Sequence, residues 1–350
     1  MNKVKTLFFV LLFCLVAGSG MAQDEYLGYA IGFYNQENLF DTCHDEGKRD
    51  YDFLPSGSYK WNGLKYSHKL KNMARVLAEM GTDKIPGVGC AIIGLAEVEN
   101  AKVMDDLTSQ EPLAERGYRY VHIEGPDRRG IDCALLYNPQ LFTVTDAVLH
   151  PYVQELAKDS AFFTRGFLTV KGELAGEELH VIVCHLPSRA SGSFYREQGA
   201  RQLKAIKDSI LSTNDEAKVI IMGDMNDDPT NKSIKDELRA KGDIDKVGKG
   251  DMFNPMYNIL VKEGRGTLMY DGAWNLFDQI LLSPNMVNKG GKRDFGTLKY
   301  FGRQVFSRDY MFQTEGKYKG NPKRTHAGGI WLDGYSDHLP VVVYLAKKKQ

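Results

Sequence analysis

The stretch Val219-Ile220-Ile221-Met222-Gly223-Asp224-Met225-Asn226-Asp227-Asp228-Pro229 joins an apolar run to a cluster of acidic and amide side chains. The run from Val219 to Met222 predicts a buried strand, and the polar residues follow where that strand ends. Asp224 and Asn226 are two positions apart, so an extended backbone would point both side chains the same way. Such a pair can hold a water molecule and polarise a phosphoryl oxygen, although an Asx-rich turn would use the same residues.

Other apolar, β-rich runs recur on both sides of this stretch. They span Ala30 to Tyr34, Ala91 to Leu95, Ala134 to Tyr137, Leu179 to Cys184, Gln279 to Leu282 and Val341 to Leu345. Apolar residues have helical spacing instead from Leu70 to Met80 and from Ala200 to Ile210. Helices mixed among many strands predict a sandwich of sheets with helices on its outer faces. The polar segments Asp41 to Tyr66 and Lys299 to Tyr335 are expected to be long loops over this core.

The composition is that of an ordinary globular protein, with 43% hydrophobic and 26% charged residues among 350. Lysine plus arginine equals aspartate plus glutamate, at 45 each. This balance argues against a protein that holds nucleic acid by bulk charge, although it leaves room for a local basic patch.

The first 22 residues have the layout of a secretory signal peptide. Lys3 and Lys5 precede an apolar run from Leu7 to Ala17, and small or weakly polar residues lead to Ala22. The apolar run is short for a membrane span, so a retained anchor is the weaker alternative. Cleavage near Ala22 would leave residues 23–350 as a single domain without a stable membrane span, exported to the periplasm or the extracellular space.

Four cysteines remain after residue 22: Cys43, Cys90, Cys133 and Cys184. One disulfide is possible in an exported protein, but three of the four lie in apolar runs, where buried free thiols are expected. No CxxC pair is present, so a zinc–cysteine site is not expected.

Two further groups of polar residues repeat the strand-end arrangement. Asn35 and Glu37 follow one apolar run, and Glu97 ends another. Carboxylates at the ends of buried strands are costly unless a cation or a donor compensates them, and hard oxygen ligands suit Mg²⁺, Mn²⁺ or Ca²⁺. Glu99, two positions after Glu97, could share this site or face solvent.

Histidines and arginines complete the candidate set. His185 follows a predicted strand directly, and His338 precedes the last one in Ser336-Asp337-His338. A histidine beside an aspartate can be held as imidazolium and donate to a phosphate, and Asp278 offers a further carboxylate to orient one. Arg189 and Arg165 are candidates to bind a substrate phosphate, because a guanidinium matches phosphate oxygens with two parallel hydrogen bonds.

Taken together, these residues resemble the motifs of the endonuclease/exonuclease/phosphatase (deoxyribonuclease I-like) superfamily in kind and in order. The matching positions are Asn35-x-Glu37, Glu97, His185, Gly223-Asp224-x-Asn226, Asp278 and Ser336-Asp337-His338. The resemblance covers nearly the whole chain after residue 22 and is closest to exported endonuclease-like proteins of Bacteroidota. It implies an α/β fold, a four-layer α-β-β-α sandwich of two mainly antiparallel sheets with outer helices.

The resemblance also implies a divalent metal, most simply Mg²⁺, with Mn²⁺ or Ca²⁺ as alternatives. Glu97 would be its principal ligand. Asn35, Glu37 and Asp337 would surround the same cation or its water molecules.

The catalytic roles follow in the same way. Asp224 would orient or deprotonate the attacking water, and Asn226 would bind the scissile phosphate. Asp278 would keep His338 charged so that it stabilises the transition state. A protonated His185 would help the leaving oxygen depart.

The substrate is less tightly constrained by sequence. Basic and aromatic residues alternate between Arg303 and His326, a composition that suits a nucleic-acid backbone with its bases but also other phosphorylated ligands. A metal-dependent phosphodiester hydrolase acting on DNA or RNA is therefore favoured, with no obligate protein partner. The alternative is a phosphatase or phospholipid phosphodiesterase of the same superfamily, of sphingomyelinase or inositol-phosphate type.

Overall fold

The computed structural model describes residues 25–154 and 163–349, so the predicted signal peptide lies outside the described residues. Two large sheets dominate this part of the chain. The first contains, in spatial order, β14 (Lys299–Val305), β17 (Val341–Lys348), β1 (Tyr26–Leu39), β2 (Cys90–Val98), β4 (Asp132–Tyr137) and β3 (Arg119–His122). The second contains β5 (Phe142–His150), β6 (Phe167–Leu174), β7 (Glu177–His185), β8 (Lys218–Asp224), β13 (Asp278–Leu282), β10 (Met252–Phe253) and β9 (Ala240–Lys241).

Most neighbouring strands in both sheets are antiparallel. The parallel pairs are β1–β2, β7–β8 and β9–β10. Two small ribbons complete the strands, β11 (Leu268–Tyr270) with β12 (Ala273–Asn275) and β15 (His326–Ala327) with β16 (Ile330–Trp331). The expected mainly antiparallel pairing is confirmed.

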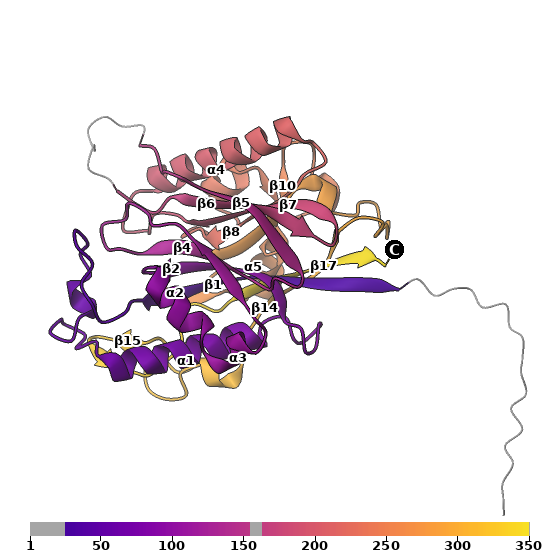
Figure 1. Cartoon of the computed structure of the whole chain (residues 1–350). Helices are drawn as coiled ribbons and strands as arrows, with labels where there is room; N and C mark the ends of the chain where they lie inside the picture. Colours follow the sequence, from indigo (N-terminus) through magenta and orange to yellow (C-terminus); the bar gives the residue numbers. More distant parts are fainter. Residues whose placement is uncertain (1–24, 155–162, 350) are drawn as a thin grey trace, which may run out of the picture.

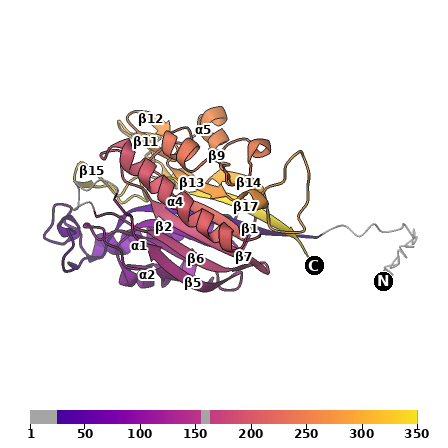
Figure 2. The ribbon, with the colours of Figure 1, turned by 90° about the horizontal axis from the view of Figure 1, so that it is seen from above.

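Helices cover the outer faces of the sandwich (Figures 1 and 2). On the side of the first sheet lie α1 (Gly63–Glu79), α2 (Ala101–Thr108) and α3 (Glu111–Ala114), whereas α4 (Ser193–Thr213) covers the second sheet. Asn62 caps α1 by accepting a hydrogen bond from the Lys65 amide, which is the usual role of an amide side chain before a helix. The four-layer order predicted from the sequence is therefore present.

The core between the sheets is tightly packed. Buried side chains of β1, β2 and β17 meet those of β7, β8 and β13. A methyl group added at Gly94 of β2 would overlap the Met222 side chain of β8, so the glycine lets the two sheets approach. A further helix, α5 (Tyr257–Glu263), lies beside the β9–β10 edge of the second sheet.

The predicted elements agree with the structure except in the polar segments. Every predicted apolar run lies in a strand, and the two helical patterns lie in α1 and α4. The expectation of an irregular segment from residue 299 was wrong for Lys299–Val305, which pairs with β17 as β14. This edge strand has partly exposed side chains and lacks the apolar run that marks a buried strand. The first polar segment likewise ends inside α1, which begins at Gly63.

All four cysteines after residue 22 are free thiols, with Cys90, Cys133 and Cys184 buried and Cys43 exposed. The expectation of buried thiols in the apolar runs is confirmed, and the possible disulfide is absent. In the part of the chain that the structure describes, no helix is both long enough and apolar enough to cross a membrane.

Candidate active site

Three of the predicted residues stand side by side on neighbouring strands of the second sheet. Asp224 ends β8 and pairs in register with His185, at the end of β7, and with Asp278, at the start of β13. Residues paired across neighbouring strands point to the same face of a sheet, so the three side chains converge. All three are almost completely buried. The backbone register itself therefore assembles this part of the site.

Gly223 is required for this register. A β-carbon at Gly223 would overlap the carbonyl oxygen of Cys184 on the neighbouring strand β7. The glycine that precedes Asp224 thus permits the close parallel pairing that places Asp224 beside His185.

The first sheet contributes residues where its pairing becomes irregular. Asn35 pairs with Ala96, and the β1–β2 register shifts immediately afterwards. Glu37 and Glu97 both have positive φ there, at 47° and 63°. Such bulges next to a site re-aim side chains, and non-glycine residues with positive φ are strained.

The expectation of an extended backbone through the two-apart pairs was wrong. Glu37 and Asn226, with φ of 47° and 50°, lie in the left-handed region. In each pair the first side chain accepts a hydrogen bond from the backbone amide of the second, Asn35 from Glu37 and Asp224 from Asn226, both at 2.9 Å. These local Asx bonds turn the chain at the strand end and send the two side chains in different directions.

His338 is held as an imidazolium by two carboxylates. Its Nδ1 lies 2.7 Å from Asp278 Oδ2, and its Nε2 lies 3.8 Å from Asp224 Oδ2. Burial alone would lower the pKa of His338, but Asp278 and Asp224 outweigh it and hold the pKa well above its ordinary value. The charged Asp278–His338 pair that the resemblance implied is present in the structure.

Burial also shifts the pKa of Asp224, and for this carboxyl group burial is the dominant influence. Burial raises its pKa to about 7, with His338 opposing the shift and Asp278 adding to it. Asn35 Nδ2 lies 3.0 Å from Asp224 Oδ2 and 3.2 Å from Glu97 Oε1, so it donates to both carboxylates. A carboxyl group with a pKa near neutrality can accept a proton from water at physiological pH.

His185 differs from its expected state. Burial, followed by the charges of Arg165 and Arg129, lowers its pKa well below the ordinary value. Asp224 Oδ2 lies only 3.5 Å from its Nε2, but the raised pKa of Asp224 weakens that attraction. Burial therefore disfavours the protonated form of His185 that the resemblance implied.

A cavity of about 340 Å³ opens over these residues. Glu97, Asp224, Asn226, His185 and His338 line it, together with Arg128, Arg129 and Arg165. Arg165 donates to Asp127 and to the Leu186 carbonyl, and its buried Nε has no hydrogen-bond partner. Arg165 therefore places a largely buried positive charge on the wall of the cavity, which favours an anionic ligand.

Arg189 lies outside the lining of this cavity. Its guanidinium donates to the Asn226 carbonyl and to Asp228, Asn231 and Asn275, and it stacks 4.3 Å from the ring centre of Phe277. The structure thus gives Arg189 a role in fixing the loop after β8, and its expected contact with phosphate has no support from this geometry.

Glu37 and Asp337 lie on the other side of the site, where Arg324 joins them. Arg324 Nε lies 3.1 Å from Glu37 Oε1, and its Nη2 lies 2.8 Å from Asp337 Oδ2. Glu37 Oε2 accepts a further hydrogen bond from the Thr325 amide at 2.7 Å. Both predicted metal ligands are therefore already compensated by positive charge and donors from the segment before Asp337.

A buried lysine supports this arrangement and was not singled out from the sequence. Lys69 of α1 is 1% exposed, and its ammonium donates to Thr325 Oγ1 at 2.7 Å and to the Tyr335 carbonyl. Burial lowers its pKa to about 8, against the attraction of Glu37. Lys69 lies four positions before Met73, on the buried face of α1. A charged residue within an apolar stripe is a signal that sequence alone could have supplied.

A divalent cation fits the oxygen donors of the site. The Asn35 side-chain oxygen is occupied by the Glu37 amide, and Arg324 contacts Glu37 and Asp337. Glu97, which borders the cavity, is the predicted ligand best placed to receive a cation there. Asp224, Asp278 and His338 are also close enough to share an ion, but an imidazolium already paired with a carboxylate is a poor metal ligand.

The comparisons with known proteins agree with this architecture. A crystal structure from Bacteroides thetaiotaomicron of an endonuclease/exonuclease/phosphatase family protein is 16% identical, with a TM-score of 0.57, over 93% of this chain and 100% of that chain. The mannosyl-6-phosphatase of the same species is 17% identical, with a TM-score of 0.55, over 91% and 99%. Zebrafish TDP2 complexed with a single-strand DNA product is 14% identical, with a TM-score of 0.52, over 91% and 98%. No curated protein matches the chain significantly.

These structural similarities confirm the deoxyribonuclease I-like fold, and the family is established by sequence. The model of the endonuclease/exonuclease/phosphatase family matches residues 30–347, which include every predicted site residue. Members of this superfamily are hydrolases of phosphoester bonds that use divalent metals. The chain belongs to the endonuclease/exonuclease/phosphatase family.

Proposed function

We propose that the chain is an exported, divalent-metal-dependent phosphodiester hydrolase that cleaves nucleic acid. The observation that carries the proposal is the buried pair of His338 and Asp278 beside Asp224, on the wall of a cavity that Arg165 also lines. A histidine whose pKa is raised by two carboxylates and a proton acceptor with a pKa of about 7 suit attack of water on a phosphate. Export rests on the sequence of residues 1–22 alone.

In the proposed reaction, water attacks phosphorus while Asp224 accepts its proton. Negative charge grows on the non-bridging oxygens, where the His338 imidazolium and Arg165 stabilise it. The bond from phosphorus to the leaving oxygen breaks, and this oxygen takes a proton from solvent, since burial lowers the pKa of His185 and disfavours its protonated form. Asn226 is fixed by its hydrogen bond to the Leu186 carbonyl, at 2.9 Å, on the wall where the phosphate would lie.

A divalent cation at Glu97 would add positive charge beside the phosphate and orient the substrate. Hard carboxylate oxygens favour Mg²⁺ or Mn²⁺ in such a position. Asn35 would keep Glu97 and Asp224 apart and oriented, since its amide donates to both.

The surroundings of the site favour a diester over a monoester. The 340 Å³ cavity reaches His338, and a second cavity of about 510 Å³ reaches its neighbour Asp337. Arg324, Lys317 and Tyr318 line the second cavity. A substrate with groups on both sides of the phosphate could extend into both cavities. The fold also accommodates nucleic acid in the zebrafish protein that was crystallised with a single-strand DNA product.

The test is cleavage by the purified protein with Mg²⁺, Mn²⁺ or Ca²⁺. Plasmid DNA, RNA, bis-p-nitrophenyl phosphate, sphingomyelin and a sugar phosphomonoester would be compared, with His338→Ala as the inactive control. The proposal expects cleavage of DNA or RNA that both EDTA and His338→Ala abolish. Intact nucleic acid together with hydrolysis of the lipid or the monoester would replace it by the phospholipase or phosphatase alternative.

A further inference from the structure

The edges of the two sheets approach one another at a groove away from the candidate active site. The β9–β10 edge of the second sheet forms one wall, β14 at the edge of the first sheet forms the other, and α5 adjoins both. The groove has a volume of about 740 Å³. β10 pairs with β13 at Leu282, the opposite end of that strand from Asp278. None of the groove residues lines either cavity of the active site.

Positive charge is concentrated in this groove. Its lining includes five cationic side chains and a single acid, whereas the whole chain has no net charge. These residues are Lys235, Lys241, Lys246, Lys262, Arg303 and Asp243. Three of the cations have acidic neighbours: Lys246 has Asp243 at 3.6 Å, Arg303 has Glu263 at 2.8 Å, and Lys235 has Asp236 at 3.9 Å.

Lys241 and Lys262 are different, because no carboxylate lies within 4.0 Å of either ammonium in the part of the chain that the structure describes. The Nε of Arg303 is buried without a hydrogen-bond partner. Two ammonium groups without a neighbouring carboxylate thus border the same space as the Arg303 guanidinium, which also contacts Glu263. Such a group of donors attracts an oxyanion.

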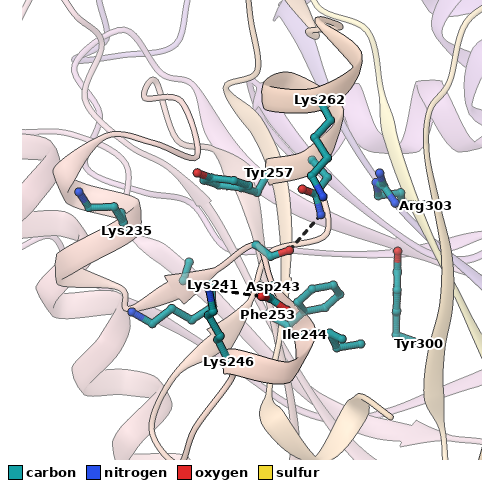
Figure 3. Close-up of a pocket in the computed structure, with 13 residues that line it drawn as sticks. Lys235, Lys241, Asp243, Ile244, Lys246, Phe253, Tyr257, Lys262, Tyr300 and Arg303 are labelled. Carbon is teal, nitrogen blue, oxygen red and sulfur yellow. Dashed lines mark hydrogen bonds and ion pairs between the residues drawn. The ribbon is translucent and has the colours of Figure 1, made fainter. Parts of the chain in front are cut away.

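Aromatic rings give the groove a second chemical character. Phe253 and Tyr300 meet edge to face, with ring centres 5.1 Å apart, and close the gap between the two sheets. Figure 3 shows Tyr257 and Tyr300 on opposite sides, with Lys262 reaching from α5 into the space between them. Cations interleaved with half-buried aromatic rings are the combination that holds a phosphate beside a flat base.

The wall that carries Tyr257 is specifically built. A methyl group added at Gly242 would overlap the Tyr257 ring, so the glycine lets the ring lie against the backbone. Asn258 holds the same wall by donating to the Gly242 carbonyl at 3.0 Å. Lys235 lies in a π-helical turn, Ser233–Glu237, a rare geometry that is frequent at functional sites.

We propose that this groove is a second, non-catalytic binding site for the phosphate and base of a nucleotide, as a free mononucleotide or within a single strand. The Lys241 and Lys262 ammonium groups and the Arg303 guanidinium bind the phosphate, and Tyr257 packs against the base. Binding at the groove requires no hydrolysis, so this proposal can be tested independently of the proposed function.

The experiment measures binding of a fluorescent oligothymidylate by anisotropy, with His338→Ala protein in EDTA so that no cleavage occurs. The test variant adds Lys241→Gln and Lys262→Gln. The control instead adds Lys71→Gln and Lys249→Gln, two exposed lysines that lie outside the groove and have no acidic partner among the residues that the structure describes. Both variants change the net charge equally, so only the position of the lost charges differs.

We expect the test variant to bind about tenfold more weakly, with the slope of log affinity against log salt reduced by about 1.4 for two lost phosphate contacts on a single strand. If the control variant loses as much affinity for the oligothymidylate, the cause is the change in net charge, and the proposal is overturned. An unchanged affinity in the test variant would overturn it as well.

Competition experiments separate the possible ligands. Thymidine monophosphate should displace the oligomer from the groove more effectively than inorganic phosphate, and Tyr257→Leu should remove this preference. Equal displacement by inorganic phosphate would overturn the assignment to a nucleotide. When His338 is intact, Lys241→Gln and Lys262→Gln should not change the rate of bis-p-nitrophenyl phosphate hydrolysis. If the wild-type protein does not hydrolyse this substrate, the proposed function is refuted, whereas the groove proposal is not.

Discussion

The candidate active site has two halves that the fold holds in different ways. His185, Asp224 and Asp278 stand in register on three neighbouring strands, and backbone hydrogen bonds fix their positions. Glu37 and Asp337 depend instead on a strained bulge and on Arg324, whose side chain is 48% exposed. Strand pairing therefore fixes the half with Asp224 and Asp278, whereas side-chain contacts hold much of the half with Glu37 and Asp337.

The largest expected effect lies in the half with Asp224 and Asp278. Asp278→Asn should lower kcat by roughly 10²–10⁴-fold, because it removes the carboxylate that keeps His338 charged. In metal-free protein the pKa of His338 should fall, so the imidazolium should deprotonate at a lower pH, which nuclear magnetic resonance can follow. Asp251→Asn is the control, since Asp251 is a buried carboxylate paired with Arg239 at 2.8 Å outside the site. An unchanged titration of His338 in Asp278→Asn would contradict the assignment.

A methyl group at Gly223 should disturb the pairing of β7 with β8 in the same half of the site. Gly223→Ala should lower the free energy of unfolding by about 3 kcal/mol, because its methyl group would overlap the Cys184 carbonyl and separate β7 from β8. Chemical denaturation measures this change. Gly63→Ala, where an added methyl group meets nothing at the start of α1, should leave stability nearly unchanged. Wild-type stability in Gly223→Ala would show that the register tolerates a wider strand separation.

The half with Glu37 and Asp337 should respond through metal affinity. Arg324→Ala should tighten Mn²⁺ binding by about three- to tenfold, because the guanidinium no longer competes with the cation for Glu37 and Asp337. Calorimetric titration without substrate measures this affinity independently of activity. Lys317→Ala serves as the control, because Lys317 lies in the same segment and has no acidic partner within residues 25–154 and 163–349. Weaker Mn²⁺ binding would mean that Arg324 supports the metal site.

The smallest expected effect concerns Glu99, an acidic residue that lies next to the candidate active site but is not part of it. Glu99 is buried and accepts the Asp41 amide at 2.7 Å, and burial raises its pKa to about 8. The folded protein therefore binds this proton more tightly than the unfolded chain, and stability falls as pH rises from about 4.5 to about 8.

Glu99→Gln should remove the loss of stability between about pH 4.5 and about pH 8, because glutamine does not ionise. We expect its melting temperature to exceed that of the wild type by a few degrees near pH 9 and to match it near pH 5. Scanning calorimetry at both pH values is the measurement. An equal shift at both pH values would mean that the effect comes from packing rather than from ionisation.

The sequence predicted the positions of many candidate site residues, because they stand next to strands that apolar runs indicate. Apolar runs such as Val219 to Met222 located the strands, and the polar residues that follow them located the site. The edge strand β14 was not predicted, because most of its side chains are partly exposed and its sequence therefore contains no apolar run. Glu99 was expected to share the site or face solvent, and it does neither, because the bulge after Glu97 turns its side chain towards the Asp41 loop.

The sequence by itself determined the strands and the sandwich of sheets with outer helices, because hydrophobic periodicity is a local property, and the family resemblance of its motifs indicated which residues meet. Only the tertiary structure decided their electrical state. The pKa of His185 is lowered by burial, whereas Asp278 and Asp224 outweigh burial and raise the pKa of His338, although both histidines lie next to a strand. The pairing of Arg324 with Glu37, 287 positions apart, likewise depends on long-range packing that no local pattern encodes.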